Sequence, residues 1–584
     1  MRIAITGIGM VSAIGIHCAE TLQSLLSEQS GIGTMRYVGS RHTEIPVGEV
    51  PYSNDELKRM AGIEPQTVIP RTSLIGLLAA REALEQSGIN LHADLAFING
   101  TTVGGMDLTE QHLRDYARGE AAENICTHGA GESALIIATH LSSLTDHHSP
   151  FNFIATSSTA CSSALNAIML GANMLRTGQV KAALVGGAES LSKFHLNGFN
   201  TLMILDRQPC RPFDADRAGL NLGEGAGYLV IEPEEEALAR GAKILGYISG
   251  YANTCDAFHQ TASSENGEGA YLAMRNALQM AGLQPSDISY VNAHGTATPN
   301  NDLSESAALR RIFGNAMPPV SSTKAFTGHT TSASGGLEAA ICVLAMNHGF
   351  IPANLRWSKG DEGLIVPVTH TEHRSLSHIL CNAFAFGGNE SSLVISAQPS
   401  ELSSQPSIVS LQPSVMVDQT DDADVSAYVT GAEARRMTPQ TRRIVAAARH
   451  ALAESGIEQP DAIICATQWG CLVQSMRFLR EMINNEEEQL KPTPFIQSTH
   501  NTVAALIALL LGNHGYNATY SQGKQSLACA IKDIETQMSL GLIKNALVLE
   551  FDEQEDEWDQ VLSLIGDHTQ NIARAHMYIY KGDR

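Results

Sequence analysis

Residues 156–170 read TSSTACSSALNAIML, with Cys161 in the sixth position. The apolar run FNFIAT (151–156) leads into this stretch and is typical of a buried strand. After Cys161 the apolar residues recur with helical spacing, namely Ala164, Leu165, Ala167, Ile168, Ala172 and Leu175. The sequence therefore predicts a strand, a tight turn and a mostly apolar helix, with Cys161 at the amino end of the helix.

This pattern occurs twice in the chain. CSSALNAIMLGANMLRTGQVKAALVGG (161–187) recurs as QSLACAIKDIETQMSLGLIKNALVLE (525–550). AREALEQSGINLHADLAFINGTTVGG (80–105) recurs as ARHALAESGIEQPDAIICATQWGC (448–471). Two matches in the same order indicate an internal duplication. The second copy has no cysteine at the position of Cys161, where either Lys524 or Gln525 falls.

The 584 residues are too many for a single core and predict two or more domains. Residues 1–398 alternate strand-like apolar runs with helix-like stretches, which indicates an α/β fold with largely buried sheets. The segment PSELSSQPSIVSLQP (399–413) is rich in Ser and Pro and predicts a linker. An α/β pattern resumes over 414–584, and we expect this part to repeat the amino-terminal half of the first domain.

Composition excludes several classes of protein. The formal charge of −23 argues against general nucleic-acid binding, which requires a basic surface. No apolar run approaches the length of a membrane span. The ten cysteines include no CxxC pair, which predicts reduced thiols and a cytoplasmic location. No His/Asp/Glu spacing is typical of a metal site, so we expect none.

The position of Cys161 has two interpretations. At the amino end of a helix, unpaired N–H groups and the helix dipole favour a thiolate, which predicts a lowered thiol pKa. The same N–H groups can stabilise an oxyanion. The alternative is a buried structural cysteine, which is how most cysteines behave. Position alone leaves both interpretations open.

Three later segments favour a reactive Cys161. VNAHGTATPNND (291–302) places His294 directly after a strand-like run. SSTKAFTGHTTSASGGLEAA (321–340) carries Lys324, His329 and Glu338 in a loop of small residues that runs into a helix. CNAFAFGGNESSLVI (381–395) is a glycine turn between strand-like runs, and it can bring Phe386 and its N–H close to a ligand. Catalytic groups of α/β folds gather at such strand ends.

Residues 1–398 resemble the β-ketoacyl–acyl carrier protein synthases of the thiolase superfamily, especially the elongating type. The segments that carry the resemblance keep the family's order and spacing: TACSSA, RPFDADRAGLNLGEGAGYLVIE, DAFHQT, VNAHGTATPNND, STKAFTGH followed by Glu338, and NAFAFGG. The resemblance implies a thiolase-like fold of duplicated βαβαβαββ halves in αβαβα layers. The two halves would then span 1–240 and 241–398.

The resemblance also implies a role for each matched residue. Cys161 would accept the acyl group, and His294 and His329 would complete a Cys-His-His triad. Lys324 and Glu338 would organise the second histidine. The gating phenylalanine would be Phe386, whose N–H forms an oxyanion hole together with that of Cys161. Two threonines would bind the phosphopantetheine arm and two residues would line the acyl pocket, namely Thr296, Thr298, Val103 and Met106.

The activity implied is a decarboxylative Claisen condensation of a Cys161-bound acyl group with malonyl–carrier protein, in elongation of fatty acid, polyketide or aryl polyene-type chains. One alternative is a non-catalytic partner throughout, against which the cysteine and two histidines argue together. Another is thiolase-type transfer on coenzyme A esters, because Cys381 precedes the second glycine turn as in the two-cysteine thiolases. We interpret Cys381 as buried packing.

Partners follow from the same resemblance. The carrier protein of this family is highly acidic, so we expect a basic mouth, with Lys58, Arg59, Arg71 and Arg207 as candidates. Phosphopantetheine arrives on the carrier, so no cofactor of the enzyme's own is expected. The resemblance also implies a homodimer.

The last domain resembles the first half of a chain-length factor, the inactive partner of polyketide-type synthases, which carries glutamine at the nucleophile's position. The alternative is a scaffold that protects a sheet edge. The synthase part departs from the family pattern at two places. GGNESS, with Asn389 and Glu390, stands where GGTNGS is usual, and Ala262 stands where a serine is common. We expect both departures to affect substrate fit.

Overall fold

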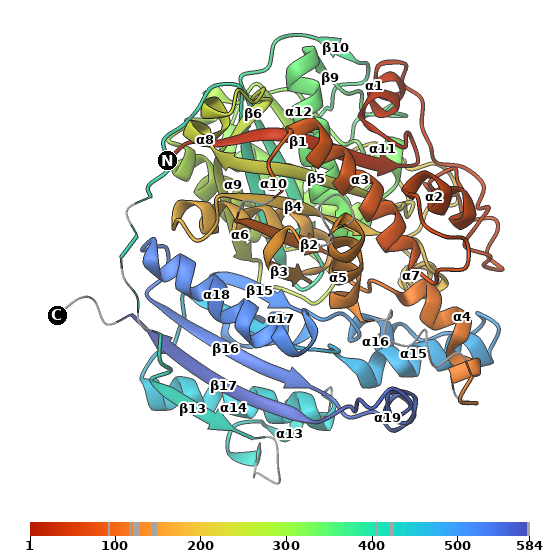
Figure 1. Cartoon of the computed structure of the whole chain (residues 1–584), viewed down its shortest axis with the longest axis vertical. Helices are drawn as coiled ribbons and strands as arrows, with labels where there is room; N and C mark the ends of the chain where they lie inside the picture. Colours follow the sequence, from red (N-terminus) through yellow and green to blue (C-terminus); the bar gives the residue numbers. More distant parts are fainter. Residues whose placement is uncertain are drawn as a thin grey trace.

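The computed structural model describes all residues except 92–93, 117, 121–128, 143–148, 405, 408, 410, 420–424, 436 and 581–584. Fifteen strands form one continuous sheet in the order β13-β17-β16-β14-β15-β3-β2-β4-β5-β1-β6-β12-β11-β7-β8 (Figure 1). The first half of the synthase domain contributes β1 (Ile3–Ser12), β2 (Leu95–Gly100), β3 (Phe151–Ser157), β4 (Ala182–Glu189) and β5 (Gly225–Pro233). Its second half contributes β6 (Gly246–Cys255), β7 (Tyr290–Asn292), β8 (Val320–Ser321), β11 (His378–Ala385) and β12 (Asn389–Ser396).

Helices separate and cover the two halves of the synthase domain (Figure 1). Helix α3 (Arg71–Ser87) packs on β1 and β5, and α9 (Glu268–Ala281) packs on β6 and β12. Between the halves lie α6 (Ser163–Arg176) and α12 (Ser334–His348), which contact each other. Both are buried along nearly their whole length, as their small and apolar sequences require. This succession of layers is the predicted thiolase-like fold.

The predicted duplication is confirmed by the second domain. Its strands are β13 (Val415–Asp418), β14 (Ala462–Ala466), β15 (Tyr516–Tyr520), β16 (Asn545–Asp552) and β17 (Ile572–Ile579). Their order β15-β14-β16-β17-β13 repeats the order β3-β2-β4-β5-β1. Helices α14 (Pro439–Ser455) and α18 (Ser526–Ser539) take the places of α3 and α6. The chain is thus a complete thiolase-like fold with an additional half.

The two domains meet along β3 and β15 with an approximate two-fold relationship. The N–H of Ser158 donates to Thr519 O at 2.9 Å, and the N–H of Ser521 donates to Thr156 O at 3.0 Å. These two bonds are reciprocal, as in an isologous dimer interface. Since β15 occupies the edge of β3, a second synthase domain cannot pair there. The predicted homodimer would have to use another surface.

The second domain has different residues on the sheet face that α12 covers in the first domain. In the synthase domain Gly187 lies opposite Gly227, and a Cβ on Gly227 would stand 2.3 Å from the Cα of Leu337 in α12. The equivalent strands of the second domain place Glu550 opposite Arg574, and their side chains form an ion pair at 3.3 Å. Among its described residues no helix corresponds to α12. Charged side chains have therefore replaced the glycines on a sheet face that no second half covers.

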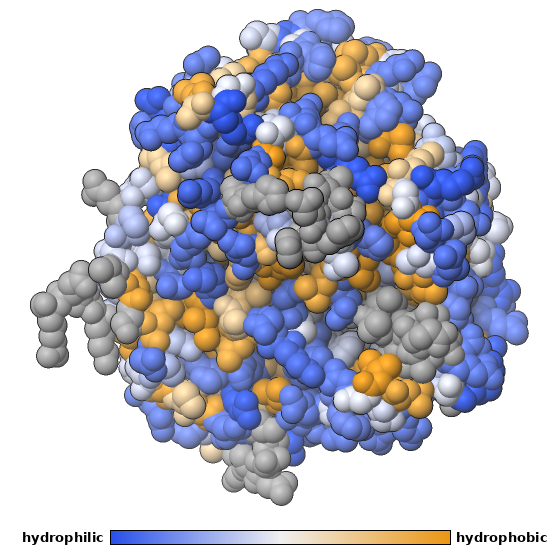
Figure 2. All heavy atoms as spheres, in the orientation of Figure 1, coloured by the Kyte–Doolittle hydropathy of each residue, from blue (hydrophilic) through white to orange (hydrophobic). Residues whose placement is uncertain are grey.

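The predicted linker follows the surface of both domains. Nε of Arg176, in the synthase domain, donates to Ser403 O at 2.8 Å, and the N–H of Ser407 donates to Ser539 O of the second domain at 2.9 Å. Hydrophilic residues prevail on the face of the molecule seen in Figure 2, where hydrophobic ones form small separate groups. Within the described parts of the chain, no helix combines the length and apolar character needed to cross a membrane.

Candidate active site

Cys161 lies in the turn that joins β3 to α6, as the sequence predicts. The turn is a single 3-10 segment, Ala160–Ser162, followed directly by the first residue of α6. Ala160 has φ +52°, a left-handed conformation that costs free energy for a residue with a Cβ. The Oγ of Ser163 donates to Ala160 O at 2.6 Å and holds the turn closed. The thiol is buried, with the residue 6% exposed.

The second domain repeats this turn with a different residue at its centre. The 3-10 segment is Gly523–Gln525, Gly523 has φ +55°, and the Oγ of Ser526 donates to Gly523 O at 2.6 Å. Cys161 is the middle residue of its 3-10 segment, and Lys524 is the middle residue of the corresponding segment. Of the two predicted residues, Lys524 is therefore the equivalent. Its side chain is 75% exposed and pairs with Asp567 at 3.3 Å.

The structure brings the predicted triad together. Nε2 of His329 lies 3.1 Å from Sγ of Cys161. The rings of His294 and His329 stand 5.3 Å apart between centroids and nearly perpendicular, at 86°. All three side chains are buried, and three separate strand ends supply them: β3, the loop after β7, and the loop after β8. The arrangement sets two imidazoles beside one sulfur.

The predicted lowering of the Cys161 pKa is wrong. Burial raises the pKa of the thiol to about 12, although the charge of Lys324 and the N–H of Phe386 oppose the shift. Burial, followed by the charge of Lys324, lowers the pKa of both His294 and His329 well below the usual range. A neutral thiol therefore rests against a neutral imidazole. The helix terminus is outweighed because the sulfur has lost its water.

Lys324 and Glu338 form a buried pair behind the histidines. Nζ of Lys324 donates to Oε1 of Glu338 at 2.5 Å. Burial raises the pKa of Glu338 to about 7, and Lys324 opposes this rise. The hydrogen bond that orients His329 comes from a residue that the sequence did not single out. Ser334 Oγ, at the start of α12, lies 3.0 Å from Nδ1 of His329.

Two further carboxyl groups lie near the site: Glu305 was missed, and Glu390 was noted only for its expected effect on substrate fit. Glu305 accepts the backbone N–H groups of His294 and Gly295 at 2.9 and 2.8 Å and so fixes the loop that carries the first histidine. Glu390 lines the cavity that reaches Cys161, and its Oε2 has no hydrogen-bond partner. Burial, followed by repulsion from Asp256 and Glu305, raises the pKa of Glu390 well above its usual range. The only sequence signal was its departure from the family pattern.

A cavity of 410 Å³ leads to the triad. Cys161, His294 and His329 line it together with Phe386 and both predicted threonines, Thr296 and Thr298. The two threonine hydroxyl groups lie 2.9 Å apart. Apolar side chains, among them Leu220 and Phe384, line the same cavity together with these hydroxyl groups. Within the described parts of the chain, no cluster of His, Cys, Asp and Glu could hold a metal ion.

A second, apolar cavity of 30 Å³ lies on the other side of Cys161. Val103 lines it as predicted, whereas Met106 packs in the neighbouring apolar cluster. The ring of Phe386 stacks on that of Phe199 at 5.7 Å and 18°. Three lining residues belong to the second domain and were not predicted, namely Phe495, Ser498 and Thr499. The second domain therefore forms part of the wall beside the nucleophile.

The predicted basic mouth is only partly supported. The prediction that Arg71 belongs to the basic mouth is wrong, because its side chain is buried and pairs with Glu224 at 2.6 Å. Arg207 is exposed but pairs with Glu44. Lys58 and Arg59 lie on α2 (Asn54–Ala61), where Arg59 is exposed. The sequence could not separate a structural arginine from surface ones because the partner of Arg71 is distant along the chain.

Comparison with known proteins identifies the family of this chain. The family "Beta-ketoacyl synthase, N-terminal domain" matches residues 1–237, and "Beta-ketoacyl synthase, C-terminal domain" matches 245–358. A second family of the N-terminal domain matches 410–574, which is the additional half. The 3-oxoacyl-(acyl-carrier-protein) synthase 2 of Vibrio cholerae is 32% identical over 410 residues, which cover 67% of this chain and 98% of that protein.

Two solved structures extend the comparison. The ishigamide ketosynthase/chain length factor is 31% identical, covers 68% of this chain and 99% of its own, and has a TM-score of 0.62. The PfaC keto synthase–chain length factor covers 100% of this chain and 79% of its own, with a TM-score of 0.78. At 17% identity it shows the fold alone. With a Cys-His-His site on a thiolase-like fold, the chain belongs to the β-ketoacyl synthase family of acyltransferases.

Proposed function

We propose that this β-ketoacyl synthase forms carbon–carbon bonds by decarboxylative Claisen condensation, and that an acyl carrier protein delivers both thioesters. The observation that carries the proposal is the convergence of Cys161, His294 and His329 in the wall of one cavity. A thiol with two neutral imidazoles suits an acyl transfer followed by stabilisation of an enolate.

In the first half-reaction the neutral thiol gives its proton to Nε2 of His329 as sulfur attacks the acyl thioester. The hydrogen-bond distance of 3.1 Å supports this transfer. The N–H groups of Cys161 and Phe386 are the candidate donors to the tetrahedral oxyanion. The carrier leaves as a thiol once a proton returns to its sulfur, and the acyl group stays on Cys161.

In the second half-reaction malonyl–carrier protein takes the vacated cavity and loses carbon dioxide. The electron pair of the broken C–C bond becomes an enolate, and an N–H donor on His294 stabilises its oxygen. Nδ1 of His294 is buried without a hydrogen-bond partner, which supports a role toward the substrate. The enolate carbon attacks the acyl-Cys161 carbonyl. The sulfur of Cys161 leaves as a thiolate and takes a proton from water, so the products are β-ketoacyl–carrier protein, carbon dioxide and the free thiol.

No resident cofactor enters these steps, because the phosphopantetheine arm belongs to the carrier. Thr296 and Thr298, in the approach to the thiol, are the candidates to bind that arm. The other candidate reaction, thiolase-type transfer on coenzyme A esters, would use a second cysteine near the first. Cys381 is fully buried and hydrogen-bonded to Cys342, and it does not line the cavity.

We assign the second domain a non-catalytic role like that of a chain-length factor. Lys524 replaces the nucleophile, and Phe495 helps to close the apolar cavity beside Cys161. A cavity of 30 Å³ admits an acyl chain only if aromatic side chains rotate away, so the second domain would limit how far the chain extends. Nine described cysteines are free and support a reducing, cytoplasmic setting.

The test is to incubate the full-length protein with an acyl–carrier protein and malonyl–carrier protein labelled in the free carboxyl group. We expect labelled carbon dioxide together with β-ketoacyl–carrier protein. Release of carbon dioxide without a condensation product would indicate a decarboxylase. Transfer to coenzyme A without carbon dioxide would indicate the thiolase-type reaction.

A further inference from the structure

Asn389 connects the second domain to the turn that carries the nucleophile. It is the first residue of β12, directly after the glycine turn of Phe386, and it is 1% exposed. Its Nδ2 donates to Asn517 O, in β15 of the second domain, at 2.6 Å. Its Oδ1 accepts from Oγ of Ser162 at 2.7 Å and from Nδ2 of Asn166 at 3.0 Å. One side chain therefore bonds to both domains.

Asn253 completes the connection from β6. Its Oδ1 accepts the N–H of Asn517 at 2.9 Å, and its Nδ2 donates to Asn517 O at 3.0 Å and to Oδ1 of Asn389 at 2.9 Å. Both backbone groups of Asn517, on the edge of β15 that faces the synthase domain, are thus paired by side-chain amides. An amide can do this because it carries a donor and an acceptor like a peptide unit.

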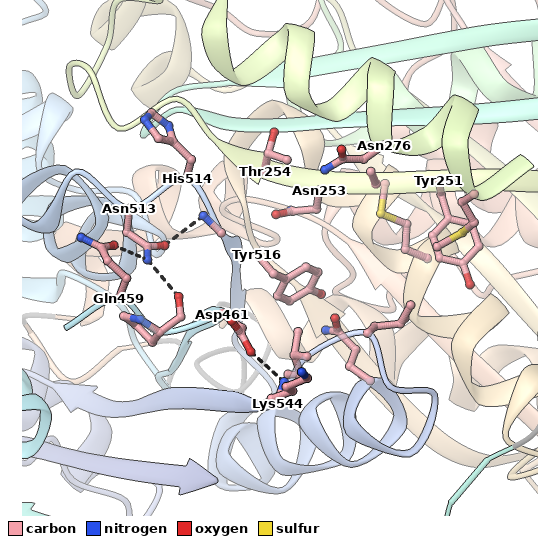
Figure 3. A pocket seen from close by; sticks show the side chains of 18 of the residues that line it. Tyr251, Asn253, Thr254, Asn276, Gln459, Asp461, Asn513, His514, Tyr516 and Lys544 are labelled. Carbon is pink, nitrogen blue, oxygen red and sulfur yellow. Dashed lines mark hydrogen bonds between the residues drawn. The ribbon is translucent and has the colours of Figure 1, made fainter. Parts of the chain in front are cut away.

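Figure 3 views this seam from a cleft of 840 Å³ between the domains, with Asn253 on the synthase side and Tyr516 on the other. Polar groups of the second domain that line the cleft bond partly to one another, as Asn513 does to Gln459, and partly across the seam, as Nδ1 of His514 does to Cys255 O at 2.8 Å. The amides at Asn517 differ because their bonds across the seam continue to Ser162, the residue after Cys161.

The inward end of this network is the catalytic turn. Ser162 follows Cys161 directly, and its Oγ lies 2.7 Å from Oδ1 of Asn389 and 2.9 Å from Thr159 O, so its one proton is shared between two acceptors. Nδ2 of Asn166 donates to Oγ1 of Thr159 at 2.8 Å. These bonds enclose Ala160, whose left-handed backbone persists only if its surroundings fix it. The second domain has Gly523 at the same point, where no such support is needed.

We propose that Asn389 is a positioning residue through which the seated second domain fixes the turn of Cys161. The proposal rests on the assignment of Cys161 as the nucleophile. It gives the departure from the family pattern at this position a physical reason: the amide is long enough to reach Asn517 while it holds Ser162. Threonine, usual in the family, could not make both bonds. The domain that lacks a nucleophile would in this way help to keep the other domain's nucleophile in place.

The discriminating substitution is Asn389→Asp in the full-length protein. It keeps an acceptor for Ser162 and Asn166 but removes the N–H that reaches Asn517. The matched control is Ser391→Ala, two residues along the same strand, where Oγ donates to Oδ1 of Asn166 without touching the second domain. Both proteins are compared with the wild type for the rate of Cys161 alkylation by iodoacetamide, for kcat, and for hydrogen exchange.

We expect Asn389→Asp to slow Cys161 alkylation and condensation about tenfold and to accelerate exchange over both 157–166 and 514–520. Ser391→Ala should change the rates less than about threefold and leave 514–520 unaffected. Unchanged alkylation and kcat in Asn389→Asp would overturn the proposal, even if 514–520 exchanged faster. Equal effects of the two substitutions would overturn it as well.

Alkylation needs no substrate, so this readout is independent of the proposed condensation reaction. If Asn389→Asp does not yield folded protein, as judged by its circular dichroism and thermal melting, Asn389→Thr takes its place with the same expected results. A failed condensation assay of the wild type would count against the proposed function alone. Normal alkylation of Cys161 in the folded Asn389 variant would count against the positioning role alone.

Discussion

Nε2 of His329 lies 3.1 Å from Sγ of Cys161, and both groups are held neutral by burial. The reactive state is therefore made during attack, when the proton passes from sulfur to imidazole. Because burial raises the thiol pKa to about 12, alkylation of Cys161 by iodoacetamide should increase continuously from about pH 7 to about pH 10. Peptide mass spectrometry measures this rate. A plateau at neutral pH would show a resting thiolate instead.

Glu390 should make stability depend on pH. Its pKa is raised by burial and then by Asp256 and Glu305, so the folded chain keeps a proton that the unfolded chain releases above about pH 4.5. This contribution to the free energy of unfolding decreases as pH rises. We expect the urea midpoint of the wild type to fall relative to that of Glu390→Gln between pH 5 and pH 8. Glu338 titrates in both proteins and cancels, whereas the repulsion between Glu305 and Glu390 is lost in Glu390→Gln and forms part of the expected difference. If the urea midpoints of the two proteins changed in parallel with pH, the raised pKa of Glu390 would be contradicted.

The two arginines that the sequence grouped together should behave differently. Arg71→Met leaves Glu224 buried without its partner and should lower the free energy of unfolding by about 3–5 kcal/mol. Arg59 lies on the surface, so Arg59→Glu should change the free energy of unfolding by less than about 0.5 kcal/mol. If α2 contacts the carrier protein, Arg59→Glu raises KM for the carrier substrate and leaves kcat nearly unchanged. An unchanged KM at several salt concentrations would remove α2 from the docking surface.

Phe495 should control how far the acyl chain extends. Phe495→Ala removes a ring from the wall of the apolar cavity, and we expect longer products in a mass spectrum of the carrier-bound chains. Phe551→Ala is the control, because that ring is equally buried in the second domain but packs in a core that does not reach the cavity. Identical product lengths in the wild type and in Phe495→Ala would show that the second domain does not limit the chain.

The sequence predicted what depends on local pattern and order. The turn of Cys161 and the loops of His294 and His329 each follow a strand, and strand ends meet at one edge, so their convergence could be predicted. The duplication was visible because its helices kept their spacing. The register between β3 and β15 could not be predicted, because it depends on the bonds of Ser158 and Ser521 between the two domains.

Features that depend on three-dimensional burial could not be predicted in this way. The pKa of the Cys161 thiol is raised by desolvation, which outweighs the effect of the helix end. Arg71 was wrongly predicted to lie on the surface because its partner Glu224 is far away in sequence. Phe495 reaches the site from a separate domain. Asn389 was noticed only as a departure from a pattern, and its meaning required the position of Asn517.

The central claim is that Cys161 carries the growing chain as a thioester before a new carbon–carbon bond forms. Full-length protein is incubated with acyl–carrier protein, and peptide mass spectrometry follows the segment that contains Cys161 before and after malonyl–carrier protein is added. We predict an acyl adduct on Cys161 that disappears as β-ketoacyl–carrier protein forms, and no adduct or condensation in Cys161→Ala. Condensation that persists in Cys161→Ala, or an adduct that malonyl–carrier protein does not discharge, would contradict the account.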